Sequence, residues 1–202
     1  MRVRAVLIAT LFTLIATFSF AQTSWFKSQL GSGPYEYWNC GPAVASMAID
    51  YSTLMDVPVE KVRKMIGLSR PNGDTSFEEL ERVMKKYDVN FQDEDWGEIH
   101  AVEIDPLLNM GYVVVVLVDL SGIPDRTNRG RGPQFGGHYL ILSAVDGDNY
   151  IVQDPYNGPD IKFNRFSVTR AMTTTRMILI SPFESLSTHI VQHPVSERNY
   201  QK

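Results

Sequence analysis

The hydrophobic pattern of the chain changes at Tyr112. Before this residue, apolar side chains recur every three to four positions, as they do on one face of an α-helix. After it come a continuous β-branched run and several short apolar or alternating runs, which are typical of strands. A helical first half followed by antiparallel strands predicts one α+β domain. With 202 residues, the chain is long enough for one full hydrophobic core.

The same patterns predict the individual elements. We expect helices over residues 40–54, 59–66, 76–87 and 104–110. A capping box of Ser76 and Glu79 opens the third helix, and the fourth begins at Asp105-Pro106 and closes at Gly111. Strands are expected over residues 113–118, 138–145, 149–153, 161–166 and 177–180, with residues 146–148 as a hairpin turn. Residues 88–98 are polar and acidic, and residues 121–137 form a long loop.

The first 21 residues have the pattern of a secretory signal peptide. Arg2 and Arg4 make a basic start, residues 6–18 are apolar, and residues 19–21 offer small side chains near a cleavage site. The apolar run is short for a bilayer span of about 20 residues. We therefore expect an exported protein, periplasmic or secreted, without stable membrane insertion once the signal is removed. Its domain would cover residues 22–184, and residues 185–202 would form a polar tail.

The charge of the chain gives no sign of a nucleic-acid partner. The formal net charge is −4, and it becomes −6 when Arg2 and Arg4 are removed. Because the charges are scattered and mildly acidic overall, they lack the basic patch that binds nucleic acid.

The sequence also gives no sign of a metal site. No cluster of His, Cys and Asp has the spacing of metal ligands, so we expect no metal site.

Cys40 is the only cysteine, and it stands where an irregular segment turns into a helix. Pro42 suits a first helical turn. A thiol there meets the free N–H groups and the positive end of the helix, which favour the thiolate. In an oxidising compartment an unpaired thiol is a liability. Cys40 is therefore buried and inert, paired with another chain, or retained for its chemistry.

His138 and Asp154 are expected at the same end of the predicted hairpin. His138 begins one strand, and Asp154 ends the next. A carboxylate there accepts a hydrogen bond from one imidazole nitrogen and leaves the other to face a thiol. This arrangement suits Cys40 as nucleophile, His138 as base and Asp154 as the residue that orients the base. Taken singly, such a histidine or aspartate is more often structural.

Three segments in this order, Cys40-Gly41-Pro42-Ala43, Gly137-His138-Tyr139 and Gln153-Asp154-Pro155, resemble papain-like cysteine peptidases of the bacteriocin-processing, double-glycine-leader type. The resemblance spans about residues 35–182. It implies a papain-like fold, with an N-terminal helical lobe that carries the nucleophile and a C-terminal antiparallel sheet that carries the other two residues. It also implies hydrolysis of a peptide or amide bond in a peptide or protein substrate through an acyl-enzyme, without metal or organic cofactor. We expect no attached transporter domain, so cleavage of exported leader peptides is not implied.

One departure from the family concerns the oxyanion hole. The family usually has a glutamine a few residues before the cysteine, and residues 34–39 contain none. Gln29, from an altered loop, and Asn39 are the candidate donors. Since one oxyanion donor contributes about 3–4 kcal/mol to transition-state stabilisation, its loss would make the enzyme slow. The alternative to an active thiol hydrolase is thus a catalytically weak or inactive papain-like domain that binds a peptide or a cell-wall ligand.

Candidate substrate-binding residues flank the expected site. Trp38 belongs to an aromatic group that either floors a cleft or packs beneath the helix. Gly137 lets another group approach the backbone closely. Arg126, Arg129 and Arg131 in the long loop suggest a preference for acidic groups, although solvated surface charge is the commoner explanation.

Overall fold

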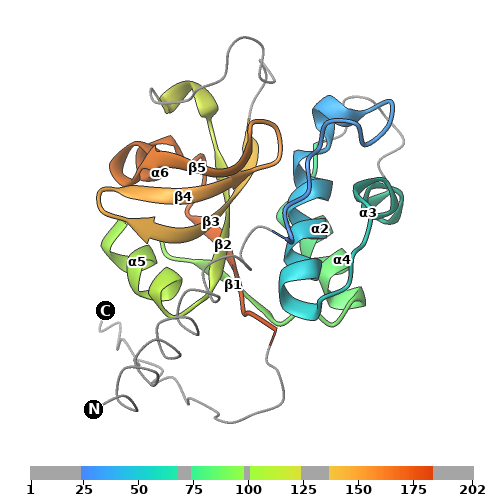
Figure 1. The fold of residues 1–202 in the computed structure, drawn as a ribbon, viewed down its shortest axis with the longest axis horizontal. Coiled ribbons are helices and arrows are strands. Elements are labelled where there is room, and N and C mark those ends of the chain that lie inside the picture. The colour runs from blue at the N-terminus through green and yellow to red at the C-terminus, as the bar shows by residue number, and fades with distance from the viewer. Residues whose placement is uncertain (1–23, 68–73, 98–100, 124–136, 184–202) are drawn as a thin grey trace, which may run out of the picture.

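A six-stranded antiparallel sheet carries helices on both of its faces (Figure 1). The computed structural model describes residues 24–67, 74–97, 101–123 and 137–183. The strand order is β1-β6-β2-β3-β4-β5. The strands are β1 (Phe91–Asp95), β2 (Val113–Val118), β3 (His138–Asp146), β4 (Asn149–Asp154), β5 (Gly158–Asn164) and β6 (Arg176–Ile180). The expected signal peptide and C-terminal tail lie outside the described residues.

The helical part of the fold is built around α2 (Cys40–Thr53), which follows the short 3-10 helix η2 (Glu36–Trp38). Helix α2 lies between the sheet on one side and α3 (Val59–Ile66) and α4 (Phe77–Lys86) on the other (Figure 1). Nine consecutive residues from Gly41 to Ile49 are buried, because the helix is covered on both sides. The nucleophile candidate thus stands at the first position of a helix that is fixed by packing along its length.

The central strand β2 explains how one sheet serves two cores. Val113 and Val115 pack into the core that contains α2, while Val114 and Val116 pack into a second core on the opposite face. The helices of that second face are α5 (Ala101–Asn109) and α6 (Arg165–Ala171). Because successive side chains of a strand point to opposite faces, a strand covered on both sides must be apolar throughout.

Most of the predicted elements are confirmed. Helix α3 has the predicted bounds, α2 ends one residue early with Leu54 in the left-handed conformation, and β2 has the predicted bounds. In the capping box, the Ser76 hydroxyl accepts from the Glu79 N–H at 3.3 Å, and the Glu79 carboxylate accepts from the Ser76 N–H at 2.9 Å. The β3–β4 hairpin forms as expected, with Asp146 paired with Asn149.

Two expectations are wrong. Helix α5 begins at Ala101 rather than at Asp105, and Pro106 lies inside it. Arg165 and Phe166 belong to α6 rather than to a strand, because the Asn164 side chain accepts from the Ser167 N–H and starts a helix there. One strand was not predicted: β1 lies in the acidic segment over residues 88–98 and pairs with β6 at the edge of the sheet.

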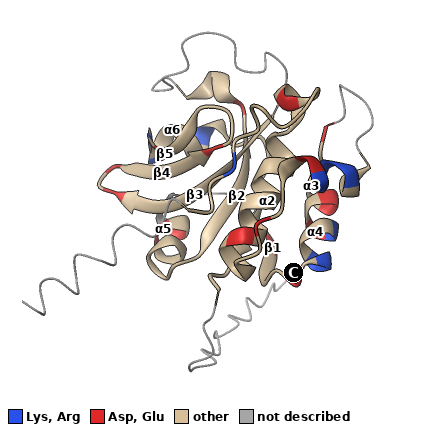
Figure 2. Ribbon diagram, turned by 45° about the vertical axis from the view of Figure 1, so that its right-hand side comes forward, with Lys and Arg blue, Asp and Glu red and all other residues tan. Residues whose placement is uncertain are grey.

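Arg176 on β6 links the helical part to the sheet edge. Its guanidinium contacts Asp93 on β1 together with Glu78 and Glu81 on α4. Figure 2 shows that charged residues gather on α3 and α4, while most of the sheet is uncharged. Within the described ranges, every helix is too short or too polar to cross a bilayer.

Candidate active site

Cys40 is the first residue of α2, and its side chain is partly exposed. The N–H groups of a first helical turn have no acceptor inside the helix, and Pro42 has no N–H at all. The N–H groups of Gly41 and Tyr139 interact with the Cys40 sulfur. Tyr139 comes directly after His138, so the start of β3 lies against the start of α2. The thiol is therefore held between the helical part and the sheet.

His138 and Asp154 are paired at the end of the β3–β4 hairpin. The His138 Nε2 atom lies 2.9 Å from the Asp154 Oδ1 atom, and both side chains are fully buried. The second ring nitrogen, Nδ1, makes no hydrogen bond of regular geometry within the described residues. The Cys40 thiol is nevertheless close enough to His138 for each to shift the pKa of the other. Loose nucleophile–base contacts are common in unliganded sites.

The pKa shifts favour a thiolate–imidazolium pair. Burial by itself raises the pKa of the Cys40 thiol, but its interactions with His138, Tyr139 N–H and Gly41 N–H bring that pKa below the ordinary value. Burial lowers the pKa of His138, yet the Asp154 carboxylate and the Cys40 sulfur outweigh it and raise that pKa to about 10. Between these two pKa values the sulfur is charged and the ring is protonated, which is the state in which a thiol is nucleophilic.

The Asp154 carboxylate is held by the turn that follows it. Its Oδ1 atom accepts from the N–H groups of Tyr156 at 2.8 Å and Asn157 at 3.1 Å, and its Oδ2 atom accepts from Asn157 Nδ2 at 2.6 Å. Although burial raises the pKa of Asp154, the bonds from His138, Asn157 and Tyr156 lower it below its usual range. Sequence reasoning missed Asn157. The signal was the Asp-Pro-Tyr-Asn turn, because an aspartate often accepts from backbone N–H groups two and three residues on.

Gly41 is required by the packing beside the nucleophile. A Cβ atom at this position would lie 2.5 Å from side-chain atoms of Thr75. The carbonyl of Thr75 accepts from the Tyr139 hydroxyl at 3.0 Å, and Tyr139 packs edge-on against Phe77. The segment that leads into α4 is thereby pressed against the first turn of α2.

The two oxyanion candidates differ in how their amides are used. Both Gln29 and Asn39 are fully buried. The Asn39 Nδ2 group donates to Ser32, and the Asn39 Oδ1 atom accepts from Arg63. The Gln29 Nε2 group donates to the Glu36 carbonyl at 2.9 Å, whereas Gln29 Oε1 has no partner among the described residues. The Gln29 backbone N–H also donates to the carbonyl of Pro155 at 2.8 Å, next to Asp154.

The candidate substrate-binding residues differ in where the structure places them. Trp38 ends η2 and is half-buried. Gly137 is exposed, and the close approach that it permits is to Leu117, whose side chain would lie 2.6 Å from an added Cβ atom. Arg126, Arg129 and Arg131 lie outside the described residues. Tyr37 belongs to the same aromatic group as Trp38, and its ring centroid lies 6.4 Å from that of Tyr156, which we did not predict.

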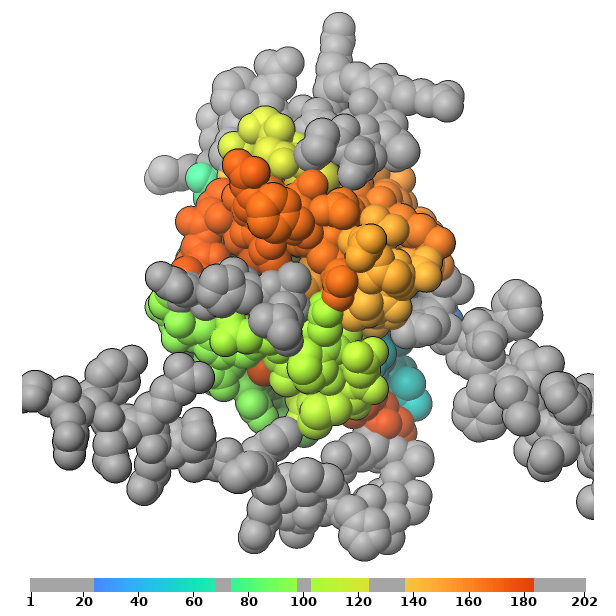
Figure 3. All heavy atoms as spheres, turned by 90° about the vertical axis from the view of Figure 1, so that its left-hand side faces the viewer, coloured from blue at the N-terminus to red at the C-terminus, as the bar shows by residue number. Residues whose placement is uncertain are grey.

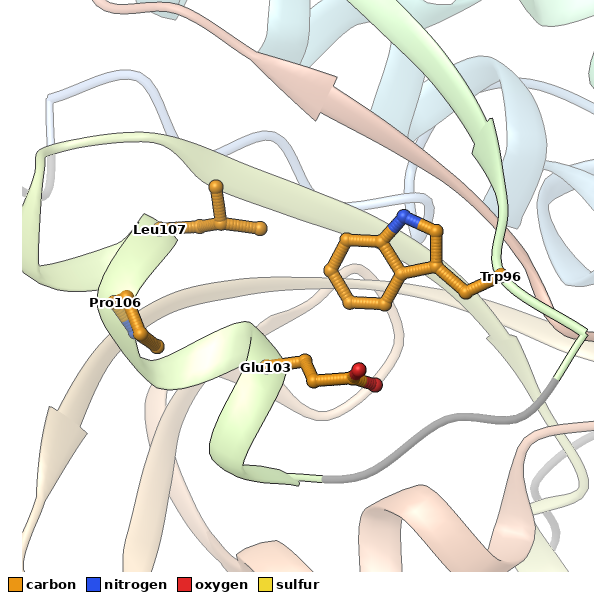
Figure 4. A pocket seen from close by; sticks show the side chains of 4 residues that line it. All are labelled: Trp96, Glu103, Pro106 and Leu107. Atoms are coloured by element: carbon orange, nitrogen blue, oxygen red, sulfur yellow. The ribbon is translucent and has the colours of Figure 1, made fainter. Parts of the chain in front are cut away.

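A separate pocket lies on the other face of the sheet. Figure 3 looks onto this face, where α5 (green) lies below α6 and β5 (orange). The pocket has a volume of about 480 Å³ and is lined by Trp96, Glu103, Pro106 and Leu107 (Figure 4). These side chains supply neither a thiol nor an imidazole, so the pocket is distinct from the Cys40 site. Within the described part of the chain, no three His, Cys, Asp or Glu side chains are placed to hold a metal ion.

A helix-borne cysteine beside a histidine at the start of an antiparallel strand defines the class of papain-like cysteine peptidase folds. The Peptidase_C39 like family matches residues 20–173, and the chain belongs to this family. It is thus a cysteine peptidase-like hydrolase, as the resemblance implied. The comparison with curated proteins found no match.

Solved structures share the fold at low identity. A C39-like peptidase from Bacillus anthracis is 20% identical, with a TM-score of 0.57 over 77% of this chain and 92% of its own. The peptidase domain of Streptococcus ComA, a bifunctional ABC transporter involved in quorum sensing, is 14% identical, with a TM-score of 0.54 over 72% and 92%. A double-glycine-motif protease from a PCAT transporter, in complex with its leader peptide, is 18% identical, with a TM-score of 0.51 over 71% and 84%.

Proposed function

We propose that the protein is an exported thiol hydrolase that cleaves peptide or amide bonds through Cys40, His138 and Asp154. The observation that carries this proposal is the buried His138–Asp154 pair at 2.9 Å. Its imidazole lies close enough to the Cys40 thiol for each group to shift the pKa of the other. Export is supported by the basic start and apolar run of residues 2–18. A peptide substrate is supported by family membership and by the leader peptide bound to the similar PCAT protease.

The first half of the reaction makes an acyl-enzyme. The Cys40 thiolate attacks the carbonyl carbon of the scissile bond, and the carbonyl oxygen becomes an oxyanion. The protonated His138 then gives its proton to the leaving amine as the carbon–nitrogen bond breaks. A thioester on Cys40 remains, and His138 is neutral. Asp154 keeps its charge throughout and stabilises the imidazolium form of the ring.

The second half releases the acyl group. Neutral His138 takes a proton from a water molecule, whose oxygen attacks the thioester carbon. The carbon–sulfur bond breaks, the carboxylic acid product leaves, and the thiolate–imidazolium pair is restored. The acid half of the substrate and the amine half are therefore released in separate steps. No cofactor enters either step.

The function is tested with purified protein that starts at Gln22 and therefore lacks residues 1–21. This protein is incubated with a library of unlabelled peptides. We expect new peptide ends that grow with time and that are absent after treatment with iodoacetamide, because alkylation removes the nucleophile. Mass spectrometry of the products identifies the cleaved bonds. Peptides that bind to the protein without being cut, combined with a thiol that is alkylated no faster than free cysteine, would instead identify a binding domain.

For the oxyanion hole we propose the Cys40 backbone N–H together with Gln29 Nε2. A primary amide has two hydrogens, and the Glu36 carbonyl takes one of those on Gln29. Asn39 uses its amide on Ser32 and Arg63. Because Gln29 is fully buried, the turn over residues 30–36 must shift for the oxyanion of the transition state to reach this amide.

Replacing Gln29 by alanine is expected to lower kcat about 10²–10³-fold with little change in KM, because the lost hydrogen bond forms only in the transition state. The measurement is steady-state hydrolysis of one cleaved library peptide. Gln153→Ala is the matched control, since Gln153 is also buried but its side chain bonds only to Ser143 and Asp160 among the described residues. Equal kcat values for the two variants would leave Gln29 out of the oxyanion hole.

A further inference from the structure

We propose that Arg63 is a positioning residue of the active site, which holds the side-chain oxygen of Asn39 away from the first turn of α2. The N–H group of Gly41 is then left for the Cys40 thiolate. The proposal rests on the thiol-hydrolase function proposed above, and it concerns what makes that thiol reactive. Neither residue contacts the reacting atoms in the reaction described.

Asn39 is the residue before Cys40 and the N-cap of α2. An asparagine at this position normally accepts a hydrogen bond from the N–H of the second or third helical residue. Here the second residue is Gly41 and the third is Pro42, which has no N–H. A capping Asn39 oxygen would therefore have Gly41 N–H as its donor. Gly41 N–H is one of the groups that lower the pKa of the Cys40 thiol, so cap and nucleophile compete for one hydrogen.

The structure resolves this competition in favour of the thiol. The Asn39 side chain makes no capping hydrogen bond, and its Oδ1 atom accepts instead from a guanidinium nitrogen of Arg63 on α3. Its Nδ2 group is anchored on the other side by the Ser32 hydroxyl at 2.7 Å. The Asn39 backbone, at φ −96° and ψ 16°, also lies outside the extended region that a capping residue normally adopts. Arg63 and Ser32 thus hold Asn39 in a conformation in which its side chain does not cap Gly41.

Arg63 is placed to act in this way. Its side chain is only 5% exposed, and the guanidinium stacks over the Tyr35 ring at 4.6 Å from the ring centroid. Burying a guanidinium costs free energy unless its N–H groups find acceptors. The planar group and the ring keep it oriented toward Asn39. Helix α3 thus contributes to the site although it lies on the far side of α2 from the sheet (Figure 1).

The test compares the rate at which iodoacetamide alkylates Cys40 at pH 6 in the wild type and in Arg63→Met, which keeps a long side chain and loses the guanidinium. We expect the methionine variant to react about tenfold more slowly, because Asn39 is then free to adopt the extended backbone of a capping residue and its oxygen takes Gly41 N–H. Hydrolysis by the same variant should show a kcat reduced about tenfold and a KM within twofold of the wild-type value.

Two further variants distinguish a positioning role of Arg63 from a purely structural one. Each variant is measured well below its Tm. Arg82→Met is the matched control, since Arg82 donates to the Ile66 carbonyl between α3 and α4 and has no contact with Asn39. It should lower Tm and leave the alkylation rate unchanged. In Arg63→Met/Asn39→Ala no side-chain oxygen remains to compete, so alkylation should recover to within threefold of the wild-type rate.

Two outcomes would overturn the proposal. One is a wild-type alkylation rate in Arg63→Met, and the other is a double variant that reacts no faster than Arg63→Met. If Arg63→Met does not fold, Asn39→Ala alone decides: alkylation within threefold of wild type supports the proposal, and a tenfold loss rejects it. Since alkylation needs no peptide, this result is independent of whether a cleaved substrate is found.

Discussion

Replacing Cys40 by alanine is expected to abolish labelling by iodoacetamide and to lower kcat for peptide hydrolysis by at least about 10⁴-fold. Cys40 is the only thiol of the chain, so the mass of one carbamidomethyl group on the wild type must come from this residue. Loss of a catalytic nucleophile removes the acyl-enzyme route and leaves only binding and electrostatic effects. The measurements are intact-protein mass spectrometry and steady-state hydrolysis.

The fold should survive this change. The Cys40 side chain is partly exposed, and its loss opens no enclosed cavity, so we expect the free energy of unfolding to stay within about 1 kcal/mol of wild type. Cys40→Ala should still bind a cleaved peptide with a Kd near the wild-type KM. Hydrolysis that persists in Cys40→Ala at a tenth or more of the wild-type rate would mean that another group is the nucleophile.

Replacing His138 by alanine is expected to slow alkylation of Cys40 at pH 6 by about 10²-fold. In the wild type, the protonated ring keeps the pKa of the thiol below its ordinary value, so a larger share of the sulfur is charged at this pH than in a free cysteine. Without the ring, that pKa returns toward about 8.5, and less than about 1% of the sulfur is thiolate at pH 6. The rate should then rise with pH up to about 9, whereas the wild-type rate should level off at a lower pH.

The pH profile of hydrolysis follows from the same pair. Activity should fall at acid pH as the thiolate takes up a proton, and at alkaline pH as the imidazolium, whose pKa is raised to about 10, loses its proton. His100→Ala serves as a control for the loss of a histidine and should keep the wild-type profile. If the wild-type thiol titrates like free cysteine and His138→Ala does not change this, the domain is a binding protein.

Local patterns were sufficient for the elements that carry the site. The helix after Cys40, the apolar run of β2 and the β3–β4 hairpin each depend on neighbours in the chain: side-chain periodicity, a proline in a first turn, or a short glycine-containing turn. Because strands of a hairpin pair from the turn outward, the same local information placed His138 and Asp154 at one end. The candidate triad was therefore within reach of sequence reasoning.

Contacts between distant segments decided the rest. The acidic β1 becomes a strand because β6 offers it an antiparallel edge, and Arg176 on β6 pairs with Asp93 on β1. No local sequence pattern predicts such a strand, because its side chains are mostly exposed and its pairing partner lies more than eighty residues away.

The chemical role of a side chain depends on such contacts as well. Asn39 has the residue type and the position of a helix cap and a candidate oxyanion donor. Arg63, 24 residues further along the chain, and Ser32 take up both ends of its amide instead. A hydrogen-bonding group serves whichever partner the packed structure brings within about 3 Å, and the order of residues along the chain does not contain that distance.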